Sequence, residues 1–440
     1  MLSSFKAKTS PHPRTRCMSG RRARVLLAAA AGTSLFCTSL AFADNFTWTG
    51  LAGTQTFTTS GNWSPSGPPG AFDIAVFAQN QANTVIFDSN QTNIALELLQ
   101  GSVTLSPDAG ATPLTRTYSL GIDSYINGGS LTLAGLAGPP ARQMQMNLGE
   151  NLYVGGDFFS GGSLSTLSLS AGAGMNVAST LKLWDAGTFN LSGGALTVGT
   201  FDHTNGGMFS FTGGSLHAGT FLGNLVTQGG TIAPGNSVGL TRVSGNLQMD
   251  SGAIEVEVGG FTPGVDYDRL DVTGSASFGS SNIIMKTTNG FTPLPGDVFE
   301  VVTYSAGVGD PTIINETGFA GLTFDPTITP TSLAIRALAQ HPGDADLNGK
   351  VDLYDLVALA THWQSNANWL GGDFDGNGFV DANDLGLLAM NWQAGVLGTP
   401  FAQAAADLGL PVSSVPEPTA MLTLLWGGAL LLYPRRGRSS

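Results

Sequence analysis

The chain contains only two cysteines in 440 residues, and both of them, Cys17 and Cys37, lie within its first 43 residues. The remainder therefore has no disulfide and no cysteine ligand for a metal ion. Charged residues make up 11% of the chain, against about 25% in typical soluble domains. An apolar content of 42% excludes a disordered chain. With 61 glycines, roughly twice the average usage, this composition predicts many short strands joined by tight turns.

The residue arrangements that carry catalysis are also missing from the sequence. We find no Ser/His/Asp arrangement, no Gly-rich phosphate loop and no Cys/His cluster. Glu255 and Glu257 stand two apart on a predicted strand, so they share one face. A glycoside hydrolase needs two carboxylates opposed across a cleft, and we interpret this pair as a solvated strand face. Two histidines, His203 and His217, are isolated. Three aspartates, Asp266, Asp268 and Asp271, are interpreted as a polar loop, with a site for a further cation as the alternative. We predict that the protein is not an enzyme.

The charges are distributed unevenly along the chain. The first 43 residues carry seven Lys or Arg and no acid, and residues 415–440 carry three Arg and one Glu. The part between them has 8 basic and 30 acidic residues, a net charge of −22. A body with this charge repels nucleic acid and attracts divalent cations.

The N-terminal segment has the order of a secretory signal peptide. A basic stretch, Lys6 to Arg24, precedes an apolar stretch, Val25 to Leu40, and Ala41-Phe42-Ala43 provides a small-x-small cleavage pattern. We predict a signal peptide over residues 1–43 and export of the rest, with an uncleaved membrane anchor as the alternative.

The C-terminal segment, residues 415–440, contains Val415-Pro416-Glu417-Pro418, then an uncharged stretch from Ala420 to Tyr433, then an arginine cluster. Fourteen helical residues would measure about 21 Å, which is shorter than a hydrocarbon core of about 30 Å. Alone, the stretch predicts a short, marginal transmembrane segment. The order Pro-Glu-Pro, apolar stretch and arginines resembles the PEP-CTERM sorting signal, which implies processing by an exosortase and delivery to the cell surface. We predict a linker over residues 397–414.

Two acidic loops, 29 residues apart, match each other almost position by position. The first starts at Asp344 and the second at Asp373, and each has Gly at loop position 6. Side-chain oxygens fall at positions 1, 3, 5, 9 and 12, the spacing of a twelve-residue calcium loop, and position 7 offers its backbone carbonyl. The predicted ligands of two Ca²⁺ ions are Asp344, Asp346, Asn348, Lys350, Asp352, Asp355, Asp373, Asp375, Asn377, Phe379, Asp381 and Asp384.

Each loop is followed by a segment with helical periodicity. Leu356, Leu359, Ala360 and Trp363 lie at i, i+3, i+4 and i+7, and the second repeat has the same pattern from Leu385 to Trp392. The duplicated unit, residues 341–396, resembles a type I dockerin module. The resemblance implies two calcium ions, two packed helices and docking onto a cohesin partner. Loop positions 10 and 11, which hold hydroxyl pairs in that family, are Leu353-Tyr354 and Ala382-Asn383 here. The alternative is that calcium only stabilises a domain with a small core.

The body is repetitive. Leu191 to Phe201 recurs as Phe211 to Phe221, a period of 20 residues, and looser copies of the Gly-Gly turn with alternating apolar residues occur from Gly128 onward. This pattern is typical of stacked coils of a parallel β-solenoid. The Trp and Asn-Trp-Ser pattern around Trp48 and Trp63, and the sequence Ala-Pro-Gly-Asn-Ser ending at Ser237, resemble the β-helical repeats of autotransporter-like exported proteins. Trp48 and Trp63 are predicted to cover the open end of the solenoid, with sugar stacking as the alternative.

The predicted architecture is mainly β. We expect a β-solenoid body over residues 44–248, with an irregular sandwich as the alternative, and a sandwich-like sheet unit over 249–338. The function that this organisation favours is that of a calcium-binding surface or extracellular-matrix protein. The alternative is an accessory protein or enzyme of polysaccharide breakdown, and carbohydrate binding without turnover is a third possibility.

Overall fold

The computed structural model describes residues 43–110, 114–235, 237–317, 319, 321–394 and 396–411. The predicted sorting signal, residues 415–440, and all of the predicted signal peptide except residue 43 lie outside them. Among the described residues, no helix is long and apolar enough to cross a membrane. The stretch 420–433, which we predict as a short transmembrane segment, is not among these residues.

The described part of the chain is mainly β, and its 26 strands belong to one large mixed sheet that is not closed. The first thirteen strands are β1 Asn45–Trp48, β2 Trp63–Ser64, β3 Ile74–Phe77, β4 Ala82–Phe87, β5 Gln91–Asn93, β6 Ala95–Leu98, β7 Ser102–Pro107, β8 Thr115–Leu120, β9 Ser124–Ile126, β10 Gly129–Leu133, β11 Gln143–Leu148, β12 Leu152–Val154 and β13 Ser165–Leu169. The others are β14 Ala173–Leu183, β15 Gly187–Asp202, β16 Met208–Leu222, β17 Leu225–Ile232, β18 Leu240–Ser244, β19 Leu247–Val258, β20 Arg269–Val272, β21 Ser275–Thr287, β22 Val298–Thr303, β23 Ala306–Gly309, β24 Thr312–Thr317, β25 Leu322–Ile328 and β26 Ser332–Ala339.

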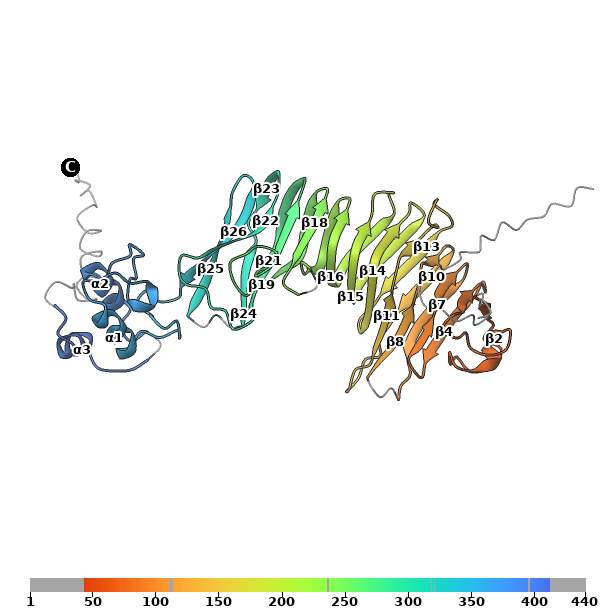
Figure 1. The fold of residues 1–440 in the computed structure, drawn as a ribbon, viewed down its shortest axis with the longest axis horizontal. Helices are drawn as coiled ribbons and strands as arrows, with labels where there is room; N and C mark the ends of the chain where they lie inside the picture. The colour runs from red at the N-terminus through yellow and green to blue at the C-terminus, as the bar shows by residue number, and fades with distance from the viewer. Residues whose placement is uncertain are drawn as a thin grey trace, which may run out of the picture. The chain divides into compact units, whose positions relative to one another are not determined.

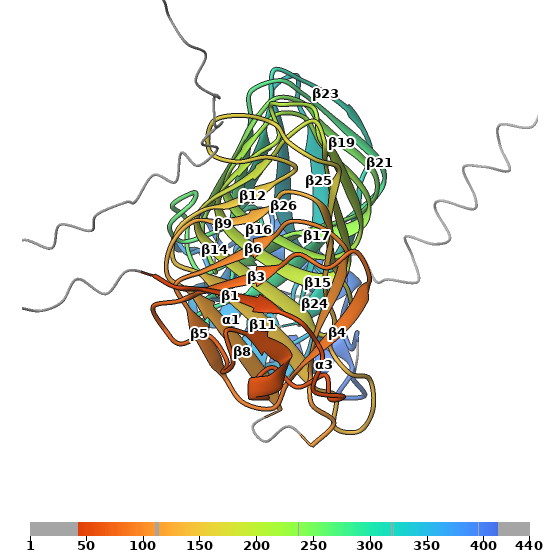
Figure 2. The same ribbon diagram turned by 90° about the vertical axis from the view of Figure 1, so that its right-hand side faces the viewer.

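Most strand pairs are parallel and join segments one repeat apart. β10, for example, pairs with β7 on one side and with β13 on the other, and Leu131 lies between Val103 and Leu167. Figure 1 shows the arrows side by side in one row, and Figure 2 views the same row from its end. Because each strand alternates inward and outward residues, parallel pairing aligns the buried side chains of successive repeats. These three, Val103, Leu131 and Leu167, are all buried.

The 20-residue period is confirmed by the pairing of β15 with β16. Leu191 lies opposite Phe211, Leu196 opposite Leu216, and Phe201 opposite Phe221. The rings of Phe201 and Phe221 stack with their centroids 4.9 Å apart at an interplanar angle of 8°. The two copies of the repeat are therefore direct neighbours in the sheet and share one core.

The predicted sandwich-like unit over 249–338 does not form a sheet of its own. β19 crosses the predicted boundary and pairs in parallel with both β17 and β21, because its alternating apolar residues continue the pattern of the preceding strands. Antiparallel pairing occurs at the two ends of the sheet, where β1 pairs with β2 and where β26 pairs with β22 and β25. At the C-terminal end, β26 covers the outer edge of β22, which would otherwise be free to pair with a strand of another molecule.

Trp48 and Trp63 lie in the core near the start of the sheet. They are 2% and 3% exposed, and their rings meet edge to face with centroids 5.1 Å apart. The Trp63 indole nitrogen donates a hydrogen bond of 2.7 Å to the carbonyl of Phe57. Such burial excludes stacking on a sugar and supports the prediction that both rings cover the end of the core.

The described residues after the sheet form three α-helices, α1 Leu353–Thr361, α2 Ala382–Met390 and α3 Phe401–Asp407. α3 corrects two predictions, the two-helix module and the linker over 397–414. Its Ala404 and Ala405 are buried in the same apolar cluster as Leu356 of α1 and Leu388 of α2. The alanine-rich sequence of α3 explains the difference, because alanine has the highest helix propensity and its small side chain permits close packing.

Gly214 offers a test of the parallel pairing. Its φ is +79°, and an added Cβ would lie 2.0 Å from the carbonyl oxygen of Gly194 on the neighbouring strand. Gly206 has a similar φ of +83°, with no atom within 4 Å of such a Cβ. Gly206→Ala should cost about 1 kcal/mol from backbone strain alone, whereas Gly214→Ala should cost several times as much because strands must separate. Urea unfolding followed by the strand circular dichroism signal measures both, and equal midpoints would contradict this close approach.

Candidate metal centre

The two predicted calcium loops end in the same local structure. Asp352 and Asp381 are the N-caps of α1 and α2, and each side chain accepts a hydrogen bond from a backbone amide of the first helical turn. Asp355 and Asp384 complete a capping box by accepting from the N-cap amides, both at 2.8 Å. Each helix therefore begins at a carboxylate pair that fixes the last four positions of the loop.

Each loop brings three carboxylates together. Asp344, Asp346 and Asp355 have oxygens within 4.8 Å of one another, and so have the oxygens of the equivalent set: Asp373, Asp375 and Asp384. Either triad could hold a metal ion. The residues at positions 1 and 12 are buried, with exposures of 0 to 5%, and those at position 3 are exposed. An ion at either site would thus lie between two buried carboxylates and one that faces solvent.

Backbone amides orient the carboxylate at position 1 in both loops. Asp344 accepts from the amides of Asn348, at 3.1 Å, and Gly349, at 2.7 Å. Asp373 accepts from Asn377 and Gly378 at 3.1 and 2.9 Å. The chain therefore curls around its first carboxylate, as a metal-binding loop must.

The carboxylate at position 12 closes each loop from the opposite side. One oxygen of Asp355 accepts from the Ala345 amide at 2.8 Å, and one oxygen of Asp384 accepts from the Phe374 amide at 2.7 Å. The other oxygen of each carboxylate accepts the hydrogen bond from the N-cap amide. Backbone hydrogen bonds alone thus hold the carboxylates at positions 1 and 12 close to each other.

Two positions in each loop adopt left-handed backbone. The glycines at position 6, Gly349 and Gly378, have φ of +85° and +88°, as the sequence predicts for the sharp turn. Position 4 is also left-handed, with φ of +56° at Leu347 and +74° at Gly376. The sequence analysis missed this position, and the glycine at 376 is the only signal that could have indicated it.

The other predicted ligands line the same loops. Asn348 and Asn377 at position 5 are exposed, as are Lys350 and Phe379 at position 7, whose side chains have no ligand role in the prediction. Asp352 and Asp381 at position 9 are half-buried and cap the helices. In twelve-residue calcium loops, position 9 often contacts the ion through water, which is compatible with this second task.

The residue at position 8 joins each loop to the other repeat. Val351 exchanges backbone hydrogen bonds of 2.9 and 3.0 Å with Gln393 and Ala394, which follow α2. Val380 makes the reciprocal pair with Gln364 and Ser365 after α1, also at 2.9 and 3.0 Å. Both valines are 0% exposed. Each loop is therefore anchored to the helix of the other repeat, a link that sequence reasoning did not find.

Trp369 is a further residue that the sequence analysis did not identify. It lies between the repeats, in a 3-10 turn over Trp369–Gly371. Its indole nitrogen donates a hydrogen bond of 2.7 Å to the backbone carbonyl of Asp344, and its ring meets that of Phe374 edge to face at 5.2 Å. It thus connects the first residues of the two loops.

Burial raises the pKa values of three of the loop carboxylates. It raises the pKa of Asp344 to about 6, and the nearby Asp355 charge adds to this effect. It also raises the pKa values of Asp355 and Asp384. Within the described residues, no Lys, Arg or His lies within 4.0 Å of any of the six carboxylates. The donor set is all oxygen, and no described basic residue pairs with its buried negative charge, so the site fits a hard divalent cation.

The acidic side chains of the body that the sequence analysis considered each bind a different partner. Asp268 is buried and accepts from the amides of Gly239 and Glu257, while Asp271 forms an ion pair with Arg269 at 2.7 Å. Glu255 pairs with Lys286 at 2.8 Å. These side chains hold neighbouring strands and loops together, and they form no acidic triad like those of the two loops in the part of the body that the structure describes.

Comparisons with known proteins add no assignment. No protein-family model matches the chain, and no curated protein is significantly similar to it in sequence.

The raised pKa values predict how the ion-free loops respond to pH. An aspartate in the unfolded chain titrates near 3.9, so the folded loops bind protons more tightly than the unfolded chain does. Their stability without metal should therefore rise as the pH falls from about 7 to about 5. With calcium present, protons compete with the ion for the same oxygens, and the trend should reverse. Amide hydrogen exchange of α1 and α2, corrected for the intrinsic pH effect, measures both, and a chelated sample that loses protection at pH 5 would contradict the shifts.

Proposed function

We propose that this chain is an exported, non-catalytic calcium-binding protein of the cell surface or extracellular matrix. The observation that carries the proposal is the duplication of one carboxylate triad, two of whose members are buried, with the same hydrogen bonds at the same loop positions in both copies. Chance acidic clusters have no reason to repeat their amide partners after 29 residues. Two ions, one in each loop, account for this duplication.

Calcium is the ion that suits these loops. Ca²⁺ takes six to eight oxygen ligands in flexible geometry, whereas Mg²⁺ demands a tight octahedron and keeps several waters. Zinc and copper favour nitrogen or sulfur ligands, and the side chains at the ligand positions of these loops offer oxygen. When bound, calcium would neutralise the buried carboxylates, and Asp344, Asp355, Asp373 and Asp384 would hold it from opposite sides of each loop.

We propose further that the parallel strands of the body form a β-solenoid. The support is the constant direction of pairing from β3 to β24, together with the 20-residue register between β15 and β16. A solenoid presents an extended, repetitive outer surface, which suits a structural role. The N-terminal signal pattern and the Pro-Glu-Pro tail, which resembles a sorting signal, support export and processing by an exosortase-type enzyme.

The dockerin-like module is proposed to dock a cohesin-like partner through its first repeat. Leu353, Tyr354 and Val357 of α1 are 53%, 78% and 41% exposed, and they share one side of the helix. The equivalent positions of α2 hold Ala382, Asn383 and Gly386, which offer little apolar surface. An exposed apolar cluster of this kind is typical of an interaction site, and the equivalent positions of the second repeat do not form one.

Single-loop variants test the calcium proposal. Asp346 and Asp375 stand at position 3 and are exposed, so their replacement disturbs folding less than that of the buried carboxylates. Asp346→Ala and Asp375→Ala should each weaken one of two sites by at least about tenfold, or about 1.4 kcal/mol. Calorimetric titration of the full chain with calcium measures this. Asp407→Ala, at an exposed acid of α3, is the matched control and should leave both sites intact. Equal losses in all three variants would contradict the assignment.

The docking proposal predicts an asymmetry between the repeats. Tyr354→Ala combined with Val357→Ala should weaken binding to an immobilised type I cohesin module by tenfold or more, because exposed aromatic and apolar anchors contribute most of the energy of an interface. The matched pair in α2, Asn383→Ala with Gly386→Ala, should change the affinity by less than twofold. Surface plasmon resonance measures both. A larger loss from the α2 pair would refute docking through the first repeat.

A further inference from the structure

A groove with a volume of ≈ 550 Å³ lies on the helical module between the end of α1 and the start of α2. It is lined by Trp363, Gln364, Phe379, Asp381, Ala382, Asn383 and Pro411. Phe379 is 40% exposed and the Trp363 ring is half-buried, so aromatic surface is accessible in the groove. Gln364 and Asn383 are exposed, and their amide groups can both donate and accept hydrogen bonds.

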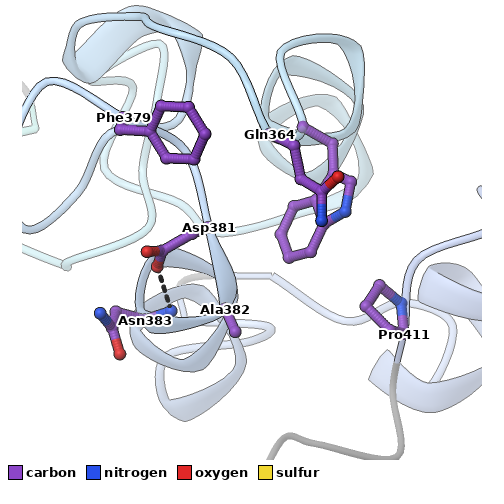
Figure 3. A pocket seen from close by; sticks show the side chains of 7 residues that line it. Gln364, Phe379, Asp381, Ala382, Asn383 and Pro411 are labelled. Carbon is purple, nitrogen blue, oxygen red and sulfur yellow. Dashed lines mark hydrogen bonds between the residues drawn. The ribbon is translucent and has the colours of Figure 1, made fainter.

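The position of Pro411 indicates what this groove could hold. In Figure 3, Pro411 stands on the opposite side from Asp381 and Asn383, whose backbone amide donates to the Asp381 carboxylate at 2.7 Å. Pro411 is the last described residue, and 29 more residues follow it in the sequence. The next segment of the chain therefore starts at the wall of the groove.

The sequence of that next segment fits an aromatic groove. It reads Val412-Ser-Ser-Val415-Pro416-Glu-Pro418. A polyproline II helix has three residues per turn and rises about 3.1 Å per residue, so Val412, Val415 and Pro418 would lie on one face. Proline-rich segments of this form bind grooves lined by aromatic side chains, because their backbone is already extended and loses little entropy on binding.

We propose that the groove is the docking site of the chain's own segment 412–418. The apolar face of Val412, Val415 and Pro418 packs on Trp363 and Phe379, and the amides of Gln364 and Asn383 bind the extended backbone. Because the segment is tethered at Pro411, its effective concentration is on the order of millimolar, and a weak contact is sufficient to hold it.

Calcium controls this contact, a step that depends on the proposed function. Phe379 and Asp381 are positions 7 and 9 of the second loop, and Ala382 and Asn383 begin α2 directly after them. Four of the seven lining residues thus take their positions from the second loop. Calcium in that loop completes the groove and keeps the segment before Thr419 against the module, and loss of the ion releases it. The sorting signal is therefore presented to its processing enzyme at a position that calcium determines.

A disulfide trap in the full chain, solubilised in detergent, tests the proposal. The leader cysteines are replaced by serine, Cys17→Ser and Cys37→Ser, and the trap is Asn383→Cys with Ser414→Cys. Oxidation in calcium should give an intramolecular disulfide at least tenfold faster than in chelator. Adding Phe379→Ala should slow it at least fivefold by removing the aromatic wall. Adding Leu370→Ala, at a side chain that is 50% exposed and lies outside both loops and the groove lining, should leave the rate unchanged.

A second cysteine pair, Tyr354→Cys with Ser414→Cys, uses the equivalent position on α1 and gives the background rate of an undocked tail. Equal rates in this pair and in the trap, or equal effects of Phe379→Ala and Leu370→Ala, would overturn the proposal. A disulfide between two chains would overturn it in favour of a second copy as the occupant. Calcium titration of the same variants distinguishes the failures, because two bound ions without trapping contradict only the docking, whereas no bound ion contradicts the proposed function.

Discussion

The helical module depends on how its buried carboxylates are neutralised. Asp344, Asp355 and Asp384 are 0% exposed, and burial of an unpaired charge costs several kcal/mol. Backbone amides contribute part of the compensation, but they bring no net charge. The proposed divalent ion in each loop would supply the missing charge. It would also explain why the same acids, caps and glycines recur in both halves of the module.

Stabilisation by the ions would extend beyond the loops. Val351 and Val380 at position 8 pair with the chain segments after α2 and α1, respectively, so each loop fixes the end of the other repeat's helix. The apolar cluster that α1 and α2 share is small and takes in α3 through Ala404 and Ala405. A core of this size is marginal by itself. Metal binding and helix packing are therefore expected to be one cooperative event.

The body depends on a different constraint, the register of parallel strands, and here the sequence was most informative. A Gly-Gly turn and alternating apolar residues at a fixed period specify both the strand and its neighbour, which is why Leu191 and Phe211 can be aligned from the sequence alone. The boundary at 249 was not predictable in this way, because β19 keeps the same alternation across it. Spacing of oxygen ligands identified the loops, since coordination imposes a pattern on the sequence. The backbone exchange at Val351 and Val380 and the role of α3 were missed, because hydrogen bonds between backbones and alanine packing leave no such pattern.

The most direct test of this account is to count the ions. Native mass spectrometry of the full chain, released from detergent in the presence of calcium, should show two calcium ions on each molecule. It should show one when Asp355 is replaced by Ala in the first loop. Chelation should remove both ions and lower the protection of α1 and α2 together. A chain that carries no calcium under these conditions, and whose helices stay equally protected after chelation, would contradict the central claim that divalent ions neutralise the buried triads.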